Sequence, residues 1–195
     1  MNQIKLVEMN QDKIFTKDNL SNLTLKPDAQ FEDCEFSGLN FLNFNFKLTV
    51  FINCKFTNCN LANQDFTNVS MRDVHFESCN LIGINWCGLK RFEGAKFYNS
   101  KLNFSNFQGL KLKKIAVQNC QVIDVDFSDS DLTESQFSNS VLGGTNFNSA
   151  ILINSDFRWA KDYLFDLRNT KVKGMKVSQS EVINLLSVLG ITVEY

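Results

Sequence analysis

Cysteine and histidine are the residues of this 195-residue chain whose chemistry could build a metal site or disulfides. Zinc sites gather such ligands at short spacings, and small secreted folds pair their cysteines. Five of the six cysteines instead share one position of a five-residue repeat: Cys34, Cys54, Cys59, Cys79 and Cys120. Stacked side chains at equivalent positions point the same way and bridge poorly, so these five are predicted to be reduced packing residues.

The rest of the sequence offers little catalytic chemistry. The one histidine, His75, falls at an outward position of the repeat and is predicted to be a surface residue. The sequence contains no nucleophile elbow, phosphate-binding loop, zinc motif or dinucleotide fingerprint. Packing in a narrow interior explains the inward Ser and Thr residues. We therefore expect no enzyme activity, no catalytic residue, no metal and no cofactor.

The repeat itself predicts the architecture that positions these residues. Every fifth residue is large and apolar over most of the chain, as in the run Phe31, Phe36, Phe41, Phe46, Phe51, Phe56, Leu61, Phe66, Met71 and Phe76. A period of five matches neither the 3.6 of a helix nor the 2.0 of a strand. The chain must therefore turn once per repeat, which predicts a solenoid.

The other repeat positions indicate how each coil is built. The residue two after the large one is often Gly or Asn, which tolerate the left-handed backbone of a tight turn. Sorting the large residues by fours separates two aromatic columns, which predicts a square coil of about twenty residues. Trp86 and Phe97 are one residue too far apart for two repeats, so Phe92 is predicted to lie between them, with one extra residue within 87–91.

Three segments are expected along the chain. Residues 1–28 are predicted to form an N-terminal cap or an atypical first coil. Residues 29–177 form the solenoid, with an irregular coil at 161–166, because Asp162 falls at a position that should be buried. Residues 178–195 are predicted to form a helix with a Ser178–Glu181 capping box, an end at Gly190, and a strand from Ile191 to Tyr195.

The repeat resembles that of the pentapeptide repeat family, whose members fold as right-handed quadrilateral β-helices. The resemblance covers roughly residues 15–195. It implies an all-β solenoid with a short C-terminal capping or dimerisation helix and strand, and the handedness is taken from the resemblance alone. Function does not follow from the repeat.

The tail carries a more specific resemblance. Residues 172–193 look like the closing segment of Qnr quinolone-resistance proteins, and residues 81–86 and 160–166 look like parts of the McbG and AlbG immunity proteins. In that group the tail forms a two-fold dimer, and the rod binds DNA gyrase or topoisomerase IV and protects it from poisons. The resemblance implies a homodimer through one apolar set: Val182, Leu185, Leu186, Leu189, Ile191 and Val193. The alternative is that the tail only caps the last coil.

Charge bears on DNA mimicry, the mechanism that the resemblance implies. One side of the coil carries the candidate topoisomerase-facing residues Asp65, Asp126, Asp129 and Asp166. The whole chain has 20 basic and 21 acidic residues and a net charge of −1, which gives a polyanion mimic only partial support. Another side carries Lys111, Lys113, Lys114, Lys171 and Lys173. No outward aromatic platform accompanies these lysines, so no direct nucleic-acid binding is expected.

Outward apolar residues favour a second function. One side of successive coils carries Leu42, Ala62, Ile82 and Ile123, with Phe104 one position further along. Contiguous exposed apolar side chains often mark a protein partner surface. The alternative function is therefore a scaffold that binds an unknown protein through this side. Because neither a signal peptide nor a membrane span is recognised, the protein is expected to be cytoplasmic, without membrane contact.

Overall fold

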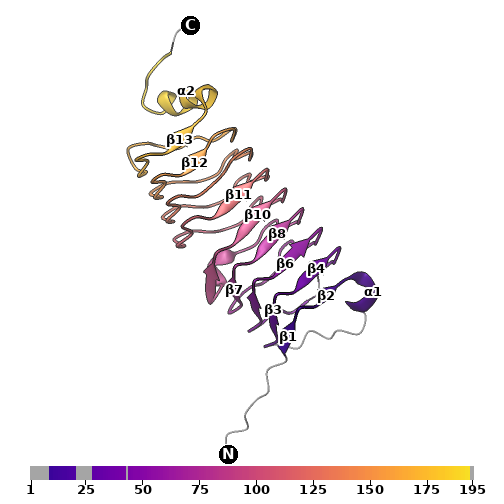
Figure 1. Cartoon of the computed structure of the whole chain (residues 1–195). Coiled ribbons are helices and arrows are strands. Elements are labelled where there is room, and N and C mark those ends of the chain that lie inside the picture. The colour runs from indigo at the N-terminus through magenta and orange to yellow at the C-terminus, as the bar shows by residue number, and fades with distance from the viewer. Residues whose placement is uncertain (1–8, 21–27, 43, 194–195) are drawn as a thin grey trace, which may run out of the picture.

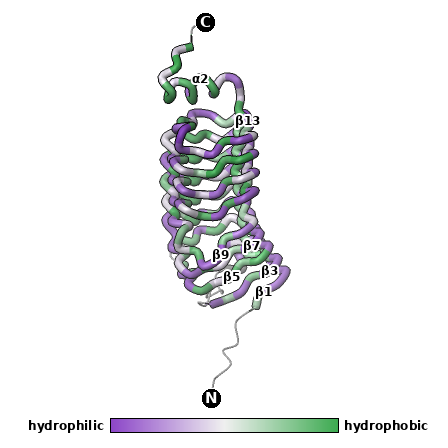
Figure 2. Tube along the Cα trace, turned by 90° about the vertical axis from the view of Figure 1, so that its left-hand side faces the viewer, coloured by the Kyte–Doolittle hydropathy of each residue, from purple (hydrophilic) through white to green (hydrophobic). Residues whose placement is uncertain are grey.

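The computed structural model describes residues 9–20, 28–42 and 44–193. These residues form a β-solenoid of about eight stacked turns. The first coil lies at one end of the rod and a short helix lies across the other end (Figure 1). Polar and apolar residues alternate around each coil rather than separating into two halves of the rod (Figure 2). The predicted fold class, a right-handed quadrilateral β-helix, is confirmed.

Two sides of the coil are parallel sheets in continuous register. The first sheet contains β1 (Met9–Gln11), β3 (Gln30–Glu32), β5 (Val50–Ile52), β7 (Ser70–Arg72) and β9 (Arg91–Glu93). The second contains β2 (Ile14–Phe15), β4 (Glu35–Ser37), β6 (Lys55–Thr57), β8 (His75–Glu77), β10 (Lys96–Tyr98) and β11 (Ala116–Gln118), and the shorter pair β12 (Asp156–Phe157) and β13 (Lys176–Val177) lies further along the rod. Isolated parallel bridges such as Asn40↔Asn60 and Asn106↔Asp126 join the other two sides.

From β3 onward the register confirms the twenty-residue coil with one interruption, whereas the first coil pairs with the next at twenty-one residues, as Phe15 does with Phe36. Phe51 pairs with Met71, twenty residues away, but Met71 pairs with Phe92, twenty-one residues away. The extra residue is accommodated in a 3₁₀ helix, η1 (Trp86–Gly88), whose start is capped by the Asn85 side chain. The predicted place of the insertion and the identity of Phe92 as the intervening large residue are therefore both correct.

Stacked aromatic rings fill the interior. Phe36, Phe56, Phe76 and Phe97 form one column with ring centroids 4.6, 5.2 and 5.2 Å apart, and Trp86 stacks on Phe107 at 5.4 Å in the opposite column. Small side chains fit beside these rings and satisfy backbone carbonyls of the preceding coil. Cys54 Sγ donates to the Phe31 carbonyl at 3.4 Å, and Ser140 Oγ donates to the Val117 carbonyl at 2.9 Å.

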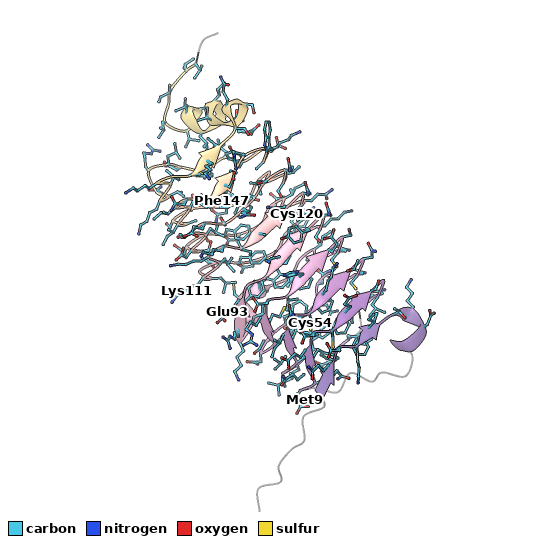
Figure 3. All side chains as sticks on the ribbon, in the orientation of Figure 1. Met9, Cys54, Glu93, Lys111, Cys120 and Phe147 are labelled. Atoms are coloured by element: carbon cyan, nitrogen blue, oxygen red, sulfur yellow. The ribbon has the colours of Figure 1, made fainter. Side chains whose placement is uncertain are left out.

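The cysteines are packing residues, as predicted. All six are free thiols, five are buried, and Cys87 is exposed. Burial raises the pKa of Cys54 and of Cys120 to about 12. These two thiols are therefore protonated at neutral pH and are poor nucleophiles or metal ligands. Figure 3 shows where Cys54 and Cys120 lie along the rod.

Residues 9–15 form an additional coil at the N-terminal end. Asn10 pairs with Phe31 and is buried, and the ring of Phe15 stacks on that of Phe36 at 4.9 Å. The short helix α1 (Lys17–Leu20) follows this coil. The rest of the segment expected to form a cap or atypical coil, residues 1–8 and 21–27, lies outside the described residues.

The helix α2 (Gln179–Ser187) follows the last coil, and here the predicted capping box is wrong. Ser178 is the N-cap residue, but its Oγ accepts a hydrogen bond from the Trp159 N–H at 2.8 Å, and Glu181 Oε2 accepts one from the Asp162 N–H at 3.2 Å. Elsewhere in the rod such N–H groups bond to a carbonyl nineteen residues later, as Leu142 does to Lys161. No further coil supplies that carbonyl here, so the two side chains take its place.

Beyond α2, the predicted helix end at Gly190 agrees with the structure and the predicted strand does not. Gly190 adopts a left-handed backbone (φ 75°) just beyond α2, as expected for a helix end. The strand expected from Ile191 to Tyr195 is absent over residues 191–193, the part of that segment which the structure describes. A strand needs a neighbouring strand to bond to, and among the described residues the Ile191 N–H donates only to the Leu186 carbonyl at the end of α2. At the irregular coil, Tyr163 and Phe165 are buried in place of Asp162.

Candidate functional site

The four predicted acidic residues lie on one side of the rod, where three of them support turns. Asp65, Asp126 and Asp166 each accept a hydrogen bond from the backbone N–H two residues later, at 2.8, 2.9 and 2.9 Å. Asn residues occupy the same position in other coils and accept the same bond, for example Asn106 and Asn146. The carboxylates therefore have a local role that is independent of any partner. Asp129 lies in a different position, with a left-handed backbone at the corner of the coil.

This side is too sparsely charged to match the charge of a duplex. Asp65 and Asp166 are five coils apart, about 24 Å at the usual spacing of paired strands. Double-stranded DNA of that length carries about 14 negative charges. The stripe has four carboxylates, and the Arg168 guanidinium lies 2.7 Å from one of them, that of Asp166. Any resemblance to DNA must therefore rest on shape and a few contacts.

The predicted apolar side has two exposed residues and several half-buried ones. Leu42 and Phe104 are 60% and 64% exposed, whereas Ala62, Ile82 and Ile123 are half-buried along the coils. Phe104 also has a left-handed backbone (φ 60°), in a column that otherwise contains Asn63, Gly83, Asp124 and Gly144. A bulky residue in this conformation is strained, and its exposed ring gains nothing from folding. Phe104 is therefore the residue on this side that is hardest to explain by stability.

We expect Phe104→Asn to raise the free energy of unfolding by about 1 kcal/mol, because Asn tolerates the left-handed backbone better than Phe. Urea denaturation of the two proteins measures the difference. Leu42→Asn is the matched control, since Leu42 is equally exposed but has an ordinary backbone, and it should give no gain. A Phe104→Asn protein no more stable than the parent would show that the position is not strained.

The tail residues predicted to form a dimer divide into two groups. Leu185 is only 3% exposed, because it packs against the core at the open end of the last coil. Leu189, Ile191 and Val193 are 36%, 48% and 38% exposed, and Val182 and Leu186 are half-buried. The tail thus caps the rod with one face and leaves a second apolar face uncovered. The capping role and a dimer through the second face are compatible.

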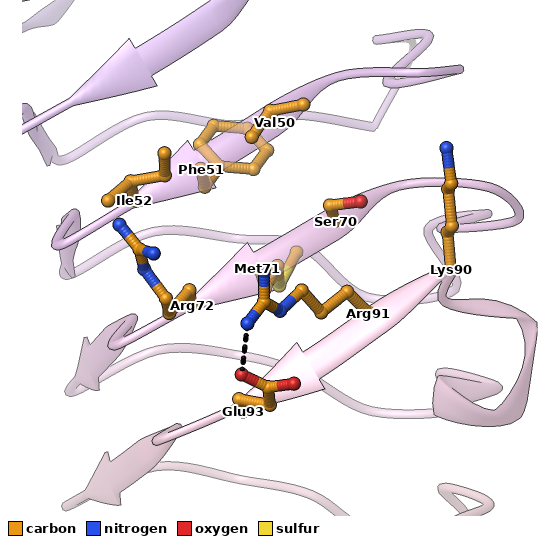
Figure 4. Close-up of a pocket in the computed structure, with 9 residues that line it drawn as sticks. All are labelled: Val50, Phe51, Ile52, Ser70, Met71, Arg72, Lys90, Arg91 and Glu93. Carbon is orange, nitrogen blue, oxygen red and sulfur yellow. Dashed lines mark hydrogen bonds and ion pairs between the residues drawn. The ribbon is translucent and has the colours of Figure 1, made fainter.

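A groove on the first sheet was not anticipated from the sequence. It has a volume of about 430 Å³ and lies over the outer face of β5, β7 and β9. Its polar lining residues are Ser70, Arg72, Lys90, Arg91 and Glu93, and Val50 and Ile52 supply apolar surface (Figure 4). The cations come together only through the twenty-one-residue register at η1.

His75 is half-buried rather than fully exposed. It lies on β8 between Lys55 and Lys96, its register partners on the neighbouring strands. Burial and the charge of Lys96 lower the pKa of His75, so the imidazole is neutral at pH 7. Within the described part of the chain, no group of three or more His, Cys, Asp or Glu residues could hold a metal ion. Over the same residues, the helices are too short and too polar to cross a membrane.

Comparisons with known proteins agree with this architecture. Family models described as a pentapeptide repeat region and as pentapeptide repeats match residues 29–91 and 130–161. No curated protein sequence matches the chain. Among solved structures, full-length QnrB1, a plasmid-mediated fluoroquinolone resistance protein, is 17% identical with a TM-score of 0.53, over 95% of this chain and 98% of that one.

Two further solved structures have lower TM-scores. A trypsin-treated variant of QnrB1 is 20% identical over 97% of this chain and 98% of that one, with a TM-score of 0.45. HetL, involved in heterocyst differentiation regulation in the cyanobacterium Nostoc, is 12% identical over 75% and 86%, with a TM-score of 0.22. At such identities the structural likenesses show the fold alone.

Proposed function

Because the chain is a pentapeptide repeat protein, we propose that it acts without catalysis, as a rigid rod that binds a type II topoisomerase and protects it from poisons. The enzyme would be DNA gyrase or topoisomerase IV, and the poison a quinolone or a peptide toxin. The observation that carries the proposal is the end-to-end likeness to QnrB1, which extends over 98% of that fluoroquinolone resistance protein. The likeness of residues 172–193 to the Qnr closing segment supports it.

In this proposal two rods join through the uncovered face of the tail, with Leu189, Ile191 and Val193 at the contact. Apolar side chains exposed together on one small segment favour such an association. The double rod has the elongated shape of a duplex segment, and Asp65, Asp126, Asp129 and Asp166 make individual contacts to the enzyme. Shape and these few contacts, rather than dense negative charge, provide recognition.

The test is gyrase supercoiling in the presence of a fluoroquinolone, with the purified protein titrated from nanomolar to tens of micromolar. We expect supercoiling to be restored. A triple variant, Asp65→Asn, Asp126→Asn and Asp166→Asn, keeps the turn hydrogen bonds, because Asn makes them in neighbouring coils. Three surface contacts, two of them from half-buried carboxylates, at about 0.5 kcal/mol each correspond to about a tenfold higher protein concentration for half-maximal rescue.

Either of two results would contradict the proposal or its details. No rescue by the parent protein at any concentration would exclude gyrase protection. Equal rescue by the triple variant would exclude the acidic side as a contact surface while leaving protection intact. Circular dichroism and thermal unfolding of the variant serve as the control for folding.

The second candidate function is a scaffold that binds another protein through the apolar side. The exposed, strained Phe104 favours it, because neither its exposure nor its backbone contributes to stability. In the same assay, Phe104→Asn should leave rescue unchanged if the enzyme is bound through the acidic side. Loss of rescue in this variant would instead place the enzyme on the apolar side.

A further inference from the structure

The groove on the first sheet combines features that the proposed function does not use. The outward side chains of its three strands stand in two rows along the rod, Val50, Ser70 and Arg91 in one and Ile52, Arg72 and Glu93 in the other. Phe51 and Met71 are buried beneath the same strands. Figure 4 shows Arg72 near one end of the groove, Lys90 at the other, and Arg91 between them.

The lining has a positive surplus. Three cations, Arg72, Lys90 and Arg91, face one carboxylate, that of Glu93. The Arg91 guanidinium lies 2.7 Å from the Glu93 carboxylate, so these two charges largely cancel. Arg72 has only a long contact of 3.9 Å to Asp73, and Lys90 has no ion pair with any residue that the structure describes. The groove therefore holds two cations that are available to a ligand.

The position of Lys90 depends on the interruption of the repeat. The 3₁₀ helix η1 adds the extra residue just before it, and the Lys90 N–H then donates to the Val69 carbonyl at 2.8 Å, which returns the chain to the sheet. Lys90 thus joins Arg91 at the start of β9, on the same coil. A regular coil would have one outward residue fewer at this point.

Apolar surface lies beside these cations. Val50 and Ile52 are on β5, at outward positions where this protein mostly has polar side chains, and both are half-buried. An aliphatic surface next to unpaired cations fits a ligand that has both an apolar group and carboxylates. Three neighbouring strands span about 10 Å, the length of three or four residues of extended peptide.

We propose that this groove binds a short acidic segment of a partner protein, with an apolar side chain on Val50 and Ile52 and carboxylates beside Arg72 and Lys90. Double-stranded DNA fits less well, because its backbone offers a charge every 1.7 Å or so and no apolar group. The Glu93 carboxylate would also repel a continuous row of phosphates.

Selection from a phage library of random seven-residue peptides on the immobilised full chain tests the proposal. We expect enriched peptides to carry two or more Asp or Glu residues around an aliphatic or aromatic residue. An enriched peptide, made with a fluorescein label, is then titrated by fluorescence anisotropy. The double variant Arg72→Ser with Lys90→Ser should weaken its binding at least tenfold, and Ile52→Ser several-fold.

The matched control is Lys101→Ser with Lys161→Ser, which removes the same charge from exposed positions on another side of the rod and should leave binding unchanged. No enrichment, enrichment without an acidic excess, or equal binding to the Arg72→Ser, Lys90→Ser protein would overturn the proposal. So would a duplex of twenty base pairs that displaces the peptide and loses binding in the same double variant. These outcomes are read without topoisomerase, so they are independent of the supercoiling result.

Discussion

Phe76→Ala is expected to lower the free energy of unfolding by about 3–5 kcal/mol, because it removes a fully buried ring from a close-packed interior. Phe76 is inaccessible to solvent and lies between Phe56 and Phe97, with centroids 5.2 Å from each. It also meets Trp86 edge to face at 5.7 Å. The neighbouring coils are held by their own backbone bonds and cannot close the cavity. Urea denaturation, followed by circular dichroism, measures the loss.

The control for this prediction is a second Phe→Ala change at Phe104, which is 64% exposed. The chemistry of the change is identical, but no cavity forms, and stability should change by about 0.5 kcal/mol or less. In a rod whose coils contact only their neighbours, Phe76→Ala should also broaden the transition, as the two halves begin to unfold separately. A loss below 1 kcal/mol at Phe76 would mean that the aromatic column does not hold the coils together.

Ile191→Asp is expected to convert the proposed dimer into a folded monomer. Ile191 is 48% exposed in the single chain, so the change should hardly affect folding, but in a two-fold interface it buries two carboxylates per dimer. We expect the dissociation constant to rise at least a hundredfold, which corresponds to about 2.7 kcal/mol. Sedimentation equilibrium at several concentrations measures it.

Two further variants make this result specific. Thr192→Asp adds the same charge to the adjacent exposed residue and should leave the dimer intact if Ile191 and Val193 form the contact. Leu185→Asp should instead destabilise the chain itself, because Leu185 is buried against the last coil. A parent protein that is monomeric at 100 μM would contradict the dimer, and a dimer that survives Ile191→Asp would place the interface elsewhere.

The interior of this rod could be predicted from the sequence in detail. Each coil packs the same kinds of side chain at the same positions. The five-residue period therefore predicts the large buried residues, the small cysteines beside them and the insertion before Phe92. The tail could not be predicted to the same degree. Ser178 and Glu181 have the spacing of a capping box, but their side-chain oxygens bond to the N–H groups of Trp159 and Asp162 instead of to the first turn of α2. These two N–H groups need a side-chain acceptor only because the last coil ends here.

The surfaces were harder to predict than the core. The sequence places Asp65, Asp126 and Asp166 on one side, but not the turn hydrogen bonds that explain their presence. Arg72 and Arg91 are far apart in sequence and become neighbours only through a register that includes the extra residue. The repeat alone determines which side chains point inward. Which outward side chains become neighbours also depends on every inserted residue between their coils.

The way in which α2 closes the rod has a consequence for evolution. Ser178 and Glu181 satisfy only the two N–H groups of the coil immediately before them. The contacts that close the rod therefore do not depend on the number of coils before them. A gene duplication of one twenty-residue unit would lengthen the rod by about 4.8 Å without disturbing either end. Length can therefore vary between descendants in discrete steps, and each step would shift the groove and the tail relative to one another by a known distance.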